Sequence, residues 1–180
     1  MDKLINTIFI LITNTKSLLL IFKTNFAMKV KLPLLSLHFP SVRIRKGGSI
    51  KIGSVRFRNG VSFFSDGGRI KIGDGCFFNN DCSVNSMGSI DIGESSIFGE
   101  GVRIYDHNHR ISSDYLVSKE VFDVAPVVIG KNCWLGSNVV ILAGVSICDR
   151  VVVGAGTIIS KNIKEPGVYI SRSKGLIKIK

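Results

Sequence analysis

Two of the three histidines of this 180-residue chain, His107 and His109, lie two positions apart in the segment YDHNHR. Imidazole can accept a proton near neutral pH, so either side chain could serve as a general base. A base of this kind needs a partner that holds one tautomer of the ring. Three acidic residues near in sequence are Asp106, Asp114 and Glu120, and the sequence leaves all three as candidates.

The two histidines lie where a sequence repeat is interrupted. The pattern Gly-x-Ile-x-Ile-Gly recurs at residues 48–53, 68–73 and 88–93, twenty positions apart. Further along, aliphatic residues occupy every sixth position, and four residues after each comes a residue that is usually small or β-branched. These aliphatic residues are Ile129, Leu135, Ile141, Ile147, Val153 and Ile159. Between Ile104 and Ile129 the spacing is not a multiple of six, which predicts a loop that projects from a corner.

A period of six fits neither an α-helix nor a single alternating strand. It predicts short strands joined by tight corners, three to a triangular turn, with one aliphatic residue per strand pointing inward. Stacked turns would pair their backbones in parallel and bury a continuous aliphatic column. Glycine follows many of the inward aliphatic residues, and we expect it to permit the backbone conformation of the corner.

This pattern resembles the hexapeptide-repeat acyltransferases, whose fold is a left-handed parallel β-helix. The resemblance covers residues 41 to about 165 and implies an all-β chain of about six turns that assembles as a homotrimer. We expect an N-terminal helical cap at residues 1–40, a β-helix acyltransferase domain at 41–170 and a basic C-terminal tail at 171–180. The loop insertion in the domain is expected at about 106–126.

The N-terminal segment follows different rules, because the glycines of the chain all lie at or after Gly47. Residues 2–26 contain neither Gly nor Pro, which predicts a helix. On this helix the polar residues form one stripe, consisting of Asn6, Thr13, Ser17 and Thr24. The remaining sector is wide and apolar, so it must be buried against something. We expect it to pack on the open first turn, with a membrane surface as the alternative. A run of eighteen uncharged apolar residues is lacking, which argues against a transmembrane helix.

The four cysteines do not have the spacing of a metal site. Cys76, Cys82 and Cys133 each fall at the small inward position of a repeat, so we expect them in the core. Cys148 has no such placement. We expect no bound metal, and two histidines within the repeat are too few for the three zinc ligands of a γ-class carbonic anhydrase.

The segment from Ile104 to Arg110 resembles the active-site segment of the galactoside, maltose and polysaccharide O-acetyltransferases, and the Asp-His-Asn-His form is nearer to the polysaccharide branch. The resemblance places the catalytic base on His109. It leaves His107 as a second acceptor-site group or a structural neighbour, and Asp106 as one candidate partner. Four residues are candidates for binding the acceptor: Asn79, Asn85, Tyr105 and Trp134.

A second resemblance concerns the coenzyme. In the run from Val127 to Ser137, the match implies that the backbone N–H of Ser137 faces the thioester oxygen. The segment Gly154-Ala155-Gly156 with Ser160 and Lys161 resembles the path of the pantetheine and the coenzyme phosphates. The family usually ends in Gly-x-Pro-Ala-Lys/Arg, whereas residues 170–175 here lack that Gly and Pro. Two lysines could still meet phosphate, namely Lys174 and Lys178.

The resemblance implies an acetyl-CoA-dependent O-acetyltransferase that acts on a sugar hydroxyl of a surface polysaccharide, such as O-antigen, capsule or exopolysaccharide, or of its precursor. N-acetylation of an amino sugar and a non-catalytic scaffold are the alternatives. The net charge of +11 favours anionic partners, but the aromatic and basic interleaving of a nucleic-acid module is missing. We expect a cytoplasmic bacterial protein, with contact to the inner face of the membrane left open.

Overall fold

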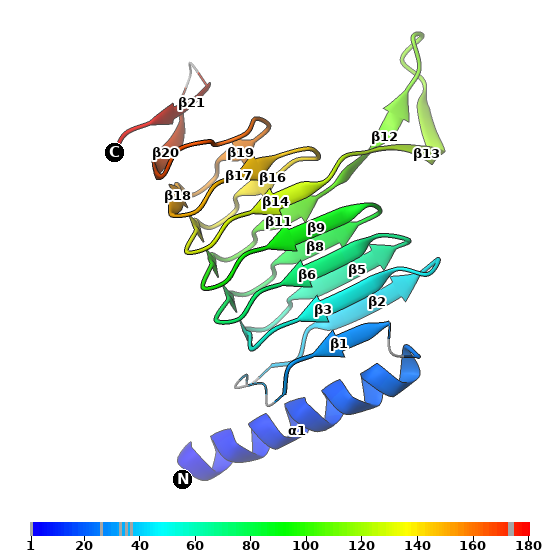
Figure 1. The fold of residues 1–180 in the computed structure, drawn as a ribbon, viewed down its shortest axis with the longest axis vertical. Coiled ribbons are helices and arrows are strands. Elements are labelled where there is room, and N and C mark those ends of the chain that lie inside the picture. The colour runs from blue at the N-terminus through cyan, green and yellow to red at the C-terminus, as the bar shows by residue number, and fades with distance from the viewer. Residues whose placement is uncertain (1, 26, 33, 35, 37, 173–174) are drawn as a thin grey trace.

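The computed structural model describes residues 2–25, 27–32, 34, 36, 38–172 and 175–180. A single helix in this part of the chain, α1 (Asp2–Lys23), precedes a stack of short strands that coil around one axis in about seven turns (Figure 1). That is one turn more than the sequence predicted. Three mainly parallel sheets form the three sides of the resulting prism.

The first sheet contains β1 (Met28–Val30), β3 (Ser49–Ile52), β6 (Arg69–Ile72), β9 (Ser89–Ile92), β14 (Val127–Ile129) and β17 (Ser146–Ile147). The second contains β4 (Arg56–Phe57), β7 (Phe77–Phe78), β10 (Ile97–Phe98), β15 (Trp134–Leu135), β18 (Val151–Val153), β20 (Gly167–Arg172) and β21 (Gly175–Lys178). The third contains β2 (Ser41–Arg45), β5 (Ser62–Asp66), β8 (Ser83–Ser86), β11 (Arg103–Tyr105), β16 (Val140–Ile141) and β19 (Ile158–Ile159).

The strand register confirms the repeat. Parallel pairing aligns one column of isoleucines through five successive turns, formed by Ile52, Ile72, Ile92, Ile129 and Ile147. All five side chains are buried. Each would contribute about 1.5–3 kcal/mol by leaving water. Three six-residue steps and one twenty-residue step therefore describe the same column, since each returns the chain to the same side of the prism.

A second column of the core is aromatic. The rings of Phe78 and Phe98 stack with centroids 4.3 Å apart and planes 5° from parallel, and Phe57 stacks on Phe78 at 5.9 Å. Phe63 meets both Phe57 and Phe78 edge to face. Such pairs add about 0.5–1.5 kcal/mol each to the burial of the rings.

The three cysteines predicted in the core are buried there. Each thiol lies near a carbonyl oxygen of the following turn: Cys76 Sγ is 3.1 Å from Gly93 O, and Cys82 Sγ is 3.1 Å from Gly99 O. Burial raises the pKa of Cys76 and of Cys82 to about 11, so both carry their proton at neutral pH. Cys148 is half-buried.

The glycines after the inward aliphatic residues have a different role from the one expected. Gly93 does not have a positive φ, but a Cβ placed on it would lie 2.6 Å from the carbonyl carbon of Gly130. A Cβ on Gly136 would likewise lie 2.6 Å from the amide nitrogen of Ala155. The close approach of the next turn therefore requires these glycines. The left-handed backbone of the corner occurs at later positions, such as Asn132 and Asn138.

Helix α1 lies across the N-terminal end of the stack (Figure 1). The parallel sheet begins just after it, at β1, whose residues pair with β3; the sequence had placed the start of the β-helix at residue 41. At the other end, β21 folds back antiparallel on β20. Most of the expected basic tail is therefore part of a sheet.

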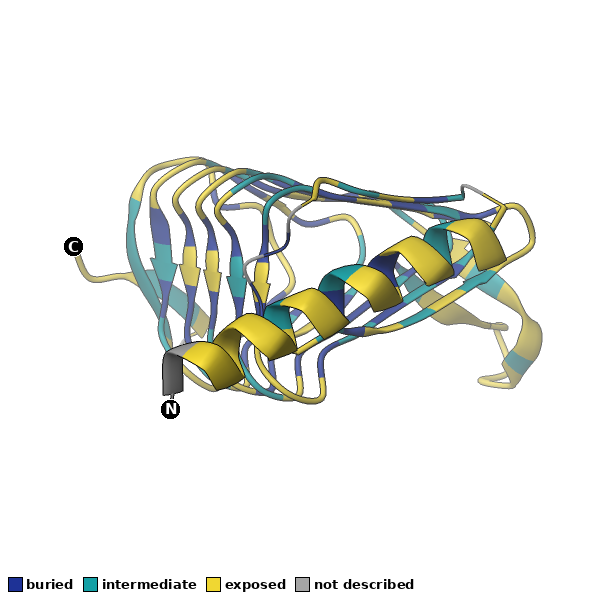
Figure 2. Ribbon diagram, turned by 90° about the horizontal axis from the view of Figure 1, so that it is seen from below, coloured by how far each residue is buried: buried dark blue, intermediate teal, exposed yellow. Residues whose placement is uncertain are grey.

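The orientation of α1 corrects an expectation. The middle of the polar stripe faces the prism, with Thr13 and Ser17 buried, while Asn6 is exposed and most of the wide apolar sector faces outward (Figure 2). The prediction that this sector packs on the first turn is wrong, because the narrow polar side makes that contact. By length and composition, Leu4–Lys23 is long and apolar enough to cross a membrane.

The interruption of the repeat is an antiparallel hairpin, formed by β12 (His107–Ile111) and β13 (Val117–Val124). The chain leaves the prism after β11 and returns at β14, so the hairpin projects from the corner between the third and first sheets (Figure 1). Its position agrees with the insertion expected at about 106–126.

Candidate active site

Asp106 occupies the corner from which the hairpin departs, and its side chain is buried. Its carboxylate lies over the corner of the preceding turn. Oδ2 accepts hydrogen bonds from Ser86 Oγ at 2.7 Å and from the Gly88 amide at 2.9 Å, and Oδ1 accepts one from the Met87 amide at 2.8 Å. Three donors thus compensate for the loss of water around this carboxylate.

His107 completes the arrangement, with Nδ1 lying 3.0 Å from Asp106 Oδ1. Facing a carboxylate oxygen, Nδ1 carries the proton of the neutral ring, which leaves Nε2 as the acceptor. The His107 side chain is 18% exposed and is flanked edge to face by Tyr105 and Phe122. The ring is therefore fixed in orientation while part of it remains accessible, as a general base requires.

His109 lies further out, on an exposed part of β12. Its Nδ1 is 2.8 Å from the carbonyl oxygen of Ser118 on β13, and its ring lies 4.5 Å from that of Phe122. The carbonyl also fixes a tautomer, but it brings no negative charge to an imidazolium. The resemblance favoured His109 as the base, whereas these contacts favour His107.

The three acidic candidates differ in their contacts, which indicate which of them could hold a histidine. Asp114 lies at the hairpin tip, where a hydrogen bond from Ser112 holds the pKa of its carboxyl below the usual value. Glu120 is an exposed residue of β13. Among the described residues, Asp106 is the candidate that contacts a histidine.

The sequence analysis did not identify the groups that hold Asp106. Ser86 precedes Asp106 by twenty residues, so the repeat length places it one turn below. That spacing could have identified Ser86 from the sequence. Phe122 carried no such signal, because its contact with both imidazole rings depends on how the hairpin folds.

The four predicted acceptor residues fall in two places. Asn85 pairs with Tyr105 in the third sheet, directly beneath the Asp106 corner. Trp134 is 53% exposed on the second sheet, a different side of the prism. Asn79 follows β7, and its Oδ1 accepts a hydrogen bond from the Asn80 amide, as a corner residue would. One chain therefore brings Asn85 and Tyr105 to the histidines but not Trp134.

The predicted coenzyme residues also divide between two corners. Ser137, Ala155 and Gly156 lie between the second and third sheets, where the Gly156 amide donates to the Ser137 carbonyl oxygen at 2.8 Å. Ser160 and Lys161 follow β19 and line a groove of about 570 Å³ together with Lys164 and Glu165.

Of the two C-terminal lysines predicted to bind phosphate, the structure describes one. The Nζ atom of Lys178 lies 3.1 Å from Glu165 Oε2, so a carboxylate already engages this ammonium group. Lys174 lies outside the described residues. Lys161 and Lys164 both line this groove, so two ammonium groups are available there to an anionic ligand. Among the described residues, no group of three or more His, Cys, Asp or Glu side chains is arranged to hold a metal ion.

Comparison with known proteins identifies the repeat. Residues 126–161 match the model of the hexapeptide repeat of succinyl-transferase. The chain is 55% identical over 38 residues to the galactoside O-acetyltransferase of Escherichia coli K12, a match covering 21% of this chain and 19% of that protein. It is 34% identical over 91 residues to the putative lipopolysaccharide biosynthesis O-acetyl transferase WbbJ of the same strain, covering 46% of each.

Among solved structures, a maltose O-acetyltransferase from Clostridium difficile 630 aligns with a TM-score of 0.58 and 31% identity, over 68% of this chain and 66% of that one. The chain is a hexapeptide-repeat protein, and its fold is the left-handed parallel β-helix. It spans less than half the length of the curated relatives described above.

Proposed function

We propose that this protein is an acetyl-CoA-dependent O-acetyltransferase that acts on a sugar hydroxyl of a bacterial surface polysaccharide or its precursor. The observation that carries this proposal is the Asp106–His107 pair, at the corner where the repeat is interrupted. The fold and the sequence similarity to two O-acetyltransferases support the same reaction class.

The chemistry requires few groups. Acetyl-CoA supplies an acetyl group that is already activated as a thioester. Nε2 of His107 removes the proton of the sugar hydroxyl as its oxygen attacks the carbonyl carbon, while Asp106 holds the ring and stabilises the imidazolium. A backbone N–H, which we assign to Ser137, donates to the developing oxyanion. When the C–S bond breaks, His107 returns the proton to the departing sulfur.

Within one chain, Ser137 lies at the corner between the second and third sheets and Trp134 lies on the second sheet, so neither lies at the corner that carries His107. We propose a homotrimer in which the second-to-third-sheet corner of one subunit faces the His107 corner of its neighbour. The coenzyme would lie between two subunits, with Ala155 and Gly156 leaving room for the pantetheine. The same arrangement would bring Trp134 to the acceptor.

The proposal is tested by incubating the purified protein with acetyl-CoA and a panel of polysaccharide repeat units. We expect release of the coenzyme thiol that depends on the acceptor, and a product whose added acetyl group is removed by mild alkali, as an ester is. An alkali-stable amide on an amino sugar would support N-acetylation instead. No turnover with any acceptor, together with no binding of coenzyme, would support a non-catalytic scaffold.

A further inference from the structure

The outward face of α1 is mostly apolar, with Thr15 and Lys16 also exposed. Leu4, Leu11, Leu19 and Phe22 are each 62–68% exposed. Five further apolar residues of the helix are 42–47% exposed: Ile5, Ile8, Phe9, Ile12 and Leu18. A helix of 22 residues is about 33 Å long, so the face is far larger than the scattered apolar residues of an ordinary surface.

The protein itself holds the face in this orientation. Asn14 makes two hydrogen bonds with the backbone of Leu34: its Oδ1 accepts from the Leu34 amide at 2.8 Å, and its Nδ2 donates to the Leu34 carbonyl at 3.2 Å. Thr13 and Ser17 are buried on the same side, and Leu20 packs against the core. Rotation that buried the apolar face would break both bonds to Leu34.

The positive charge of the chain is concentrated at the same end. Residues 1–60 contain eleven Lys and Arg and one acidic residue, Asp2, whereas residues 61–180 contain thirteen Lys and Arg against twelve Asp and Glu. Nearly all of the net charge of +11 therefore belongs to α1 and the first turns above it.

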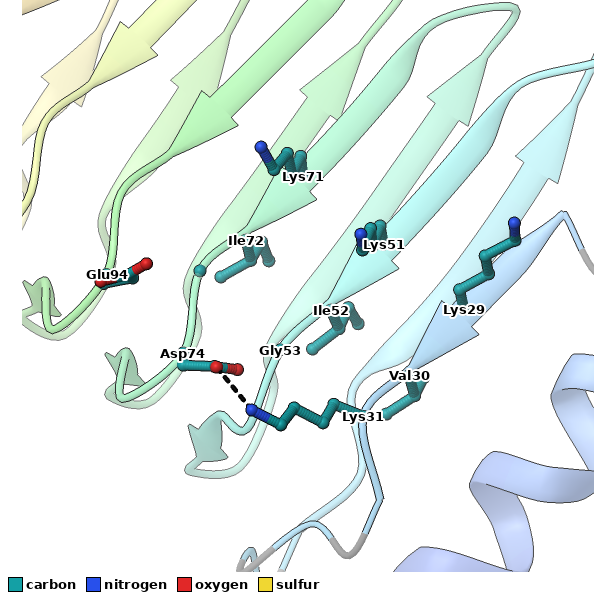
Figure 3. A pocket seen from close by; sticks show the side chains of 11 residues that line it. Lys29, Val30, Lys31, Lys51, Ile52, Gly53, Lys71, Ile72, Asp74 and Glu94 are labelled. Carbon is teal, nitrogen blue, oxygen red and sulfur yellow. Dashed lines mark hydrogen bonds and ion pairs between the residues drawn. The ribbon is translucent and has the colours of Figure 1, made fainter.

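Part of this charge forms an ordered row. Lys29, Lys51 and Lys71 are aligned in register on β1, β3 and β6, and their side chains point outward from the sheet (Figure 3). Successive strands lie about 4.8 Å apart, so the row begins beside α1 and rises only about 10 Å. Arg43 and Arg45 are exposed on β2, on another side of the prism. All five charges thus lie on the first three turns of the prism, at the end that carries α1.

We propose that α1 lies flat in the interface of an anionic phospholipid bilayer, with its outer face among the acyl chains and these lysines and arginines near the headgroups. Apolar area and positive charge on one end are the two features that such a surface recognises together. The helix lies in the interface and does not cross the membrane, because its inner side is hydrogen-bonded to the prism. This proposal does not depend on the catalytic one.

The test is sedimentation of the whole protein with two kinds of vesicle, phosphatidylcholine alone and an equal mixture of phosphatidylcholine and phosphatidylglycerol. We expect binding to the mixed vesicles, at least tenfold weaker binding to phosphatidylcholine alone, and weakening by high salt. Leu11→Glu/Leu19→Glu should abolish sedimentation, and Lys29→Glu/Lys51→Glu should weaken it at least tenfold. All four positions are exposed, so we expect unchanged circular dichroism and thermal unfolding.

The matched control is Ile179→Glu, which also replaces an exposed aliphatic residue by a carboxylate, at the opposite end of the prism. It should sediment with vesicles like the unaltered protein. Failure of the unaltered protein to bind, or unchanged binding of Leu11→Glu/Leu19→Glu, would overturn the proposal. If that variant instead reduced the oligomer size in solution and vesicles were not bound, the face would be an interface between copies. Retention in the membrane after a carbonate wash would show a crossing helix and overturn the interfacial position.

Discussion

The carboxylate of Asp106 shows how one residue can link the fold to the chemistry. It is buried, and its hydrogen bonds to the corner at residues 86–88 stabilise the stack at the point where the hairpin leaves it. The oxygen that accepts from Met87 also faces the imidazole of His107. The position of the ring is therefore determined by the parallel stacking of two turns.

At this scale the first prediction concerns the base. His107→Ala should lower kcat by roughly 10²–10⁴-fold, which is the usual contribution of a general base. His109→Ala is the matched variant and should cost much less, because His109 faces a carbonyl oxygen on an exposed strand. Coenzyme release under saturating acetyl-CoA measures both. The reverse order of effects would move the base to His109 and contradict the assignment.

A second prediction concerns Asp106 as a positioning residue. Asp106→Asn keeps the size of the side chain but brings an amide group toward hydrogen-bond donors, so the free energy of unfolding should fall by about 1–3 kcal/mol. Loss of the carboxylate beside His107 should also lower kcat by about 10²-fold or more, with little change in KM for acetyl-CoA. Urea unfolding and steady-state kinetics check the two effects separately. A stability loss with unchanged kcat would make Asp106 purely structural.

The sequence predicted that both histidines lie at the interruption of the repeat, but not which of them has the acidic partner. Both are polar residues next to the interruption, and the resemblance aligned the outer one. Their difference arises from the corner at residues 86–88, which determines the direction of the Asp106 carboxylate. The repeat length of twenty points to Ser86, but the two backbone amides carry no side-chain signal.

At the scale of elements, the repeat fixed the strands and their register because each turn repeats the same inward positions. Helix α1 was predicted as a helix with a polar stripe, yet its orientation was not. A periodic pattern shows that an apolar sector exists and leaves open what covers it. The two hydrogen bonds of Asn14 to Leu34 bind the polar side to the prism. Strand β1 was not predicted because its three residues lie outside the glycine-containing units.

The cysteines of the core give a prediction about pH and reactivity. Burial raises the pKa of Cys76 and Cys82 to about 11 and also raises that of Cys133 above its ordinary value. A disulfide reagent at pH 8 should therefore label Cys148 fastest, and all four thiols only after denaturation. Rapid labelling of two or more thiols in the native protein would contradict the buried placement.

The same raised pKa values determine how the free energy of unfolding depends on pH. Well below pH 9 both the folded and the unfolded chain carry the thiol protons, so the free energy of unfolding should not depend on these groups. Between about 9 and 11 the unfolded chain ionises first, and the protein should become less stable as the pH rises. Replacement of Cys76 by Ser should reduce this slope, and denaturant unfolding at several pH values measures it.

For the whole molecule, the proposed division of the site between two corners predicts that neighbouring subunits form each site together. His107→Ala removes the base, and Ala155→Trp should fill the space meant for the coenzyme at an exposed corner position. Each variant alone should have strongly reduced activity. Co-expressed, they should form mixed trimers in which some sites have both corners intact, with part of the activity restored. Light scattering should show a trimer, and a monomer at micromolar concentration or no restoration of activity would contradict the shared site.

The number of turns between α1 and the Asp106 corner sets the distance between the helix and the histidines. Tyr105, next to the Asp106 corner, is the fourth residue of a register column that starts at Arg43 and passes through Phe64 and Asn85. Three strand spacings amount to about 14 Å, measured along the prism axis from the turn nearest to α1. With α1 resting on a bilayer, the imidazole would stand at a set height above the lipid, so a lipid-linked sugar chain would be acetylated at a unit whose distance from its anchor matches that height.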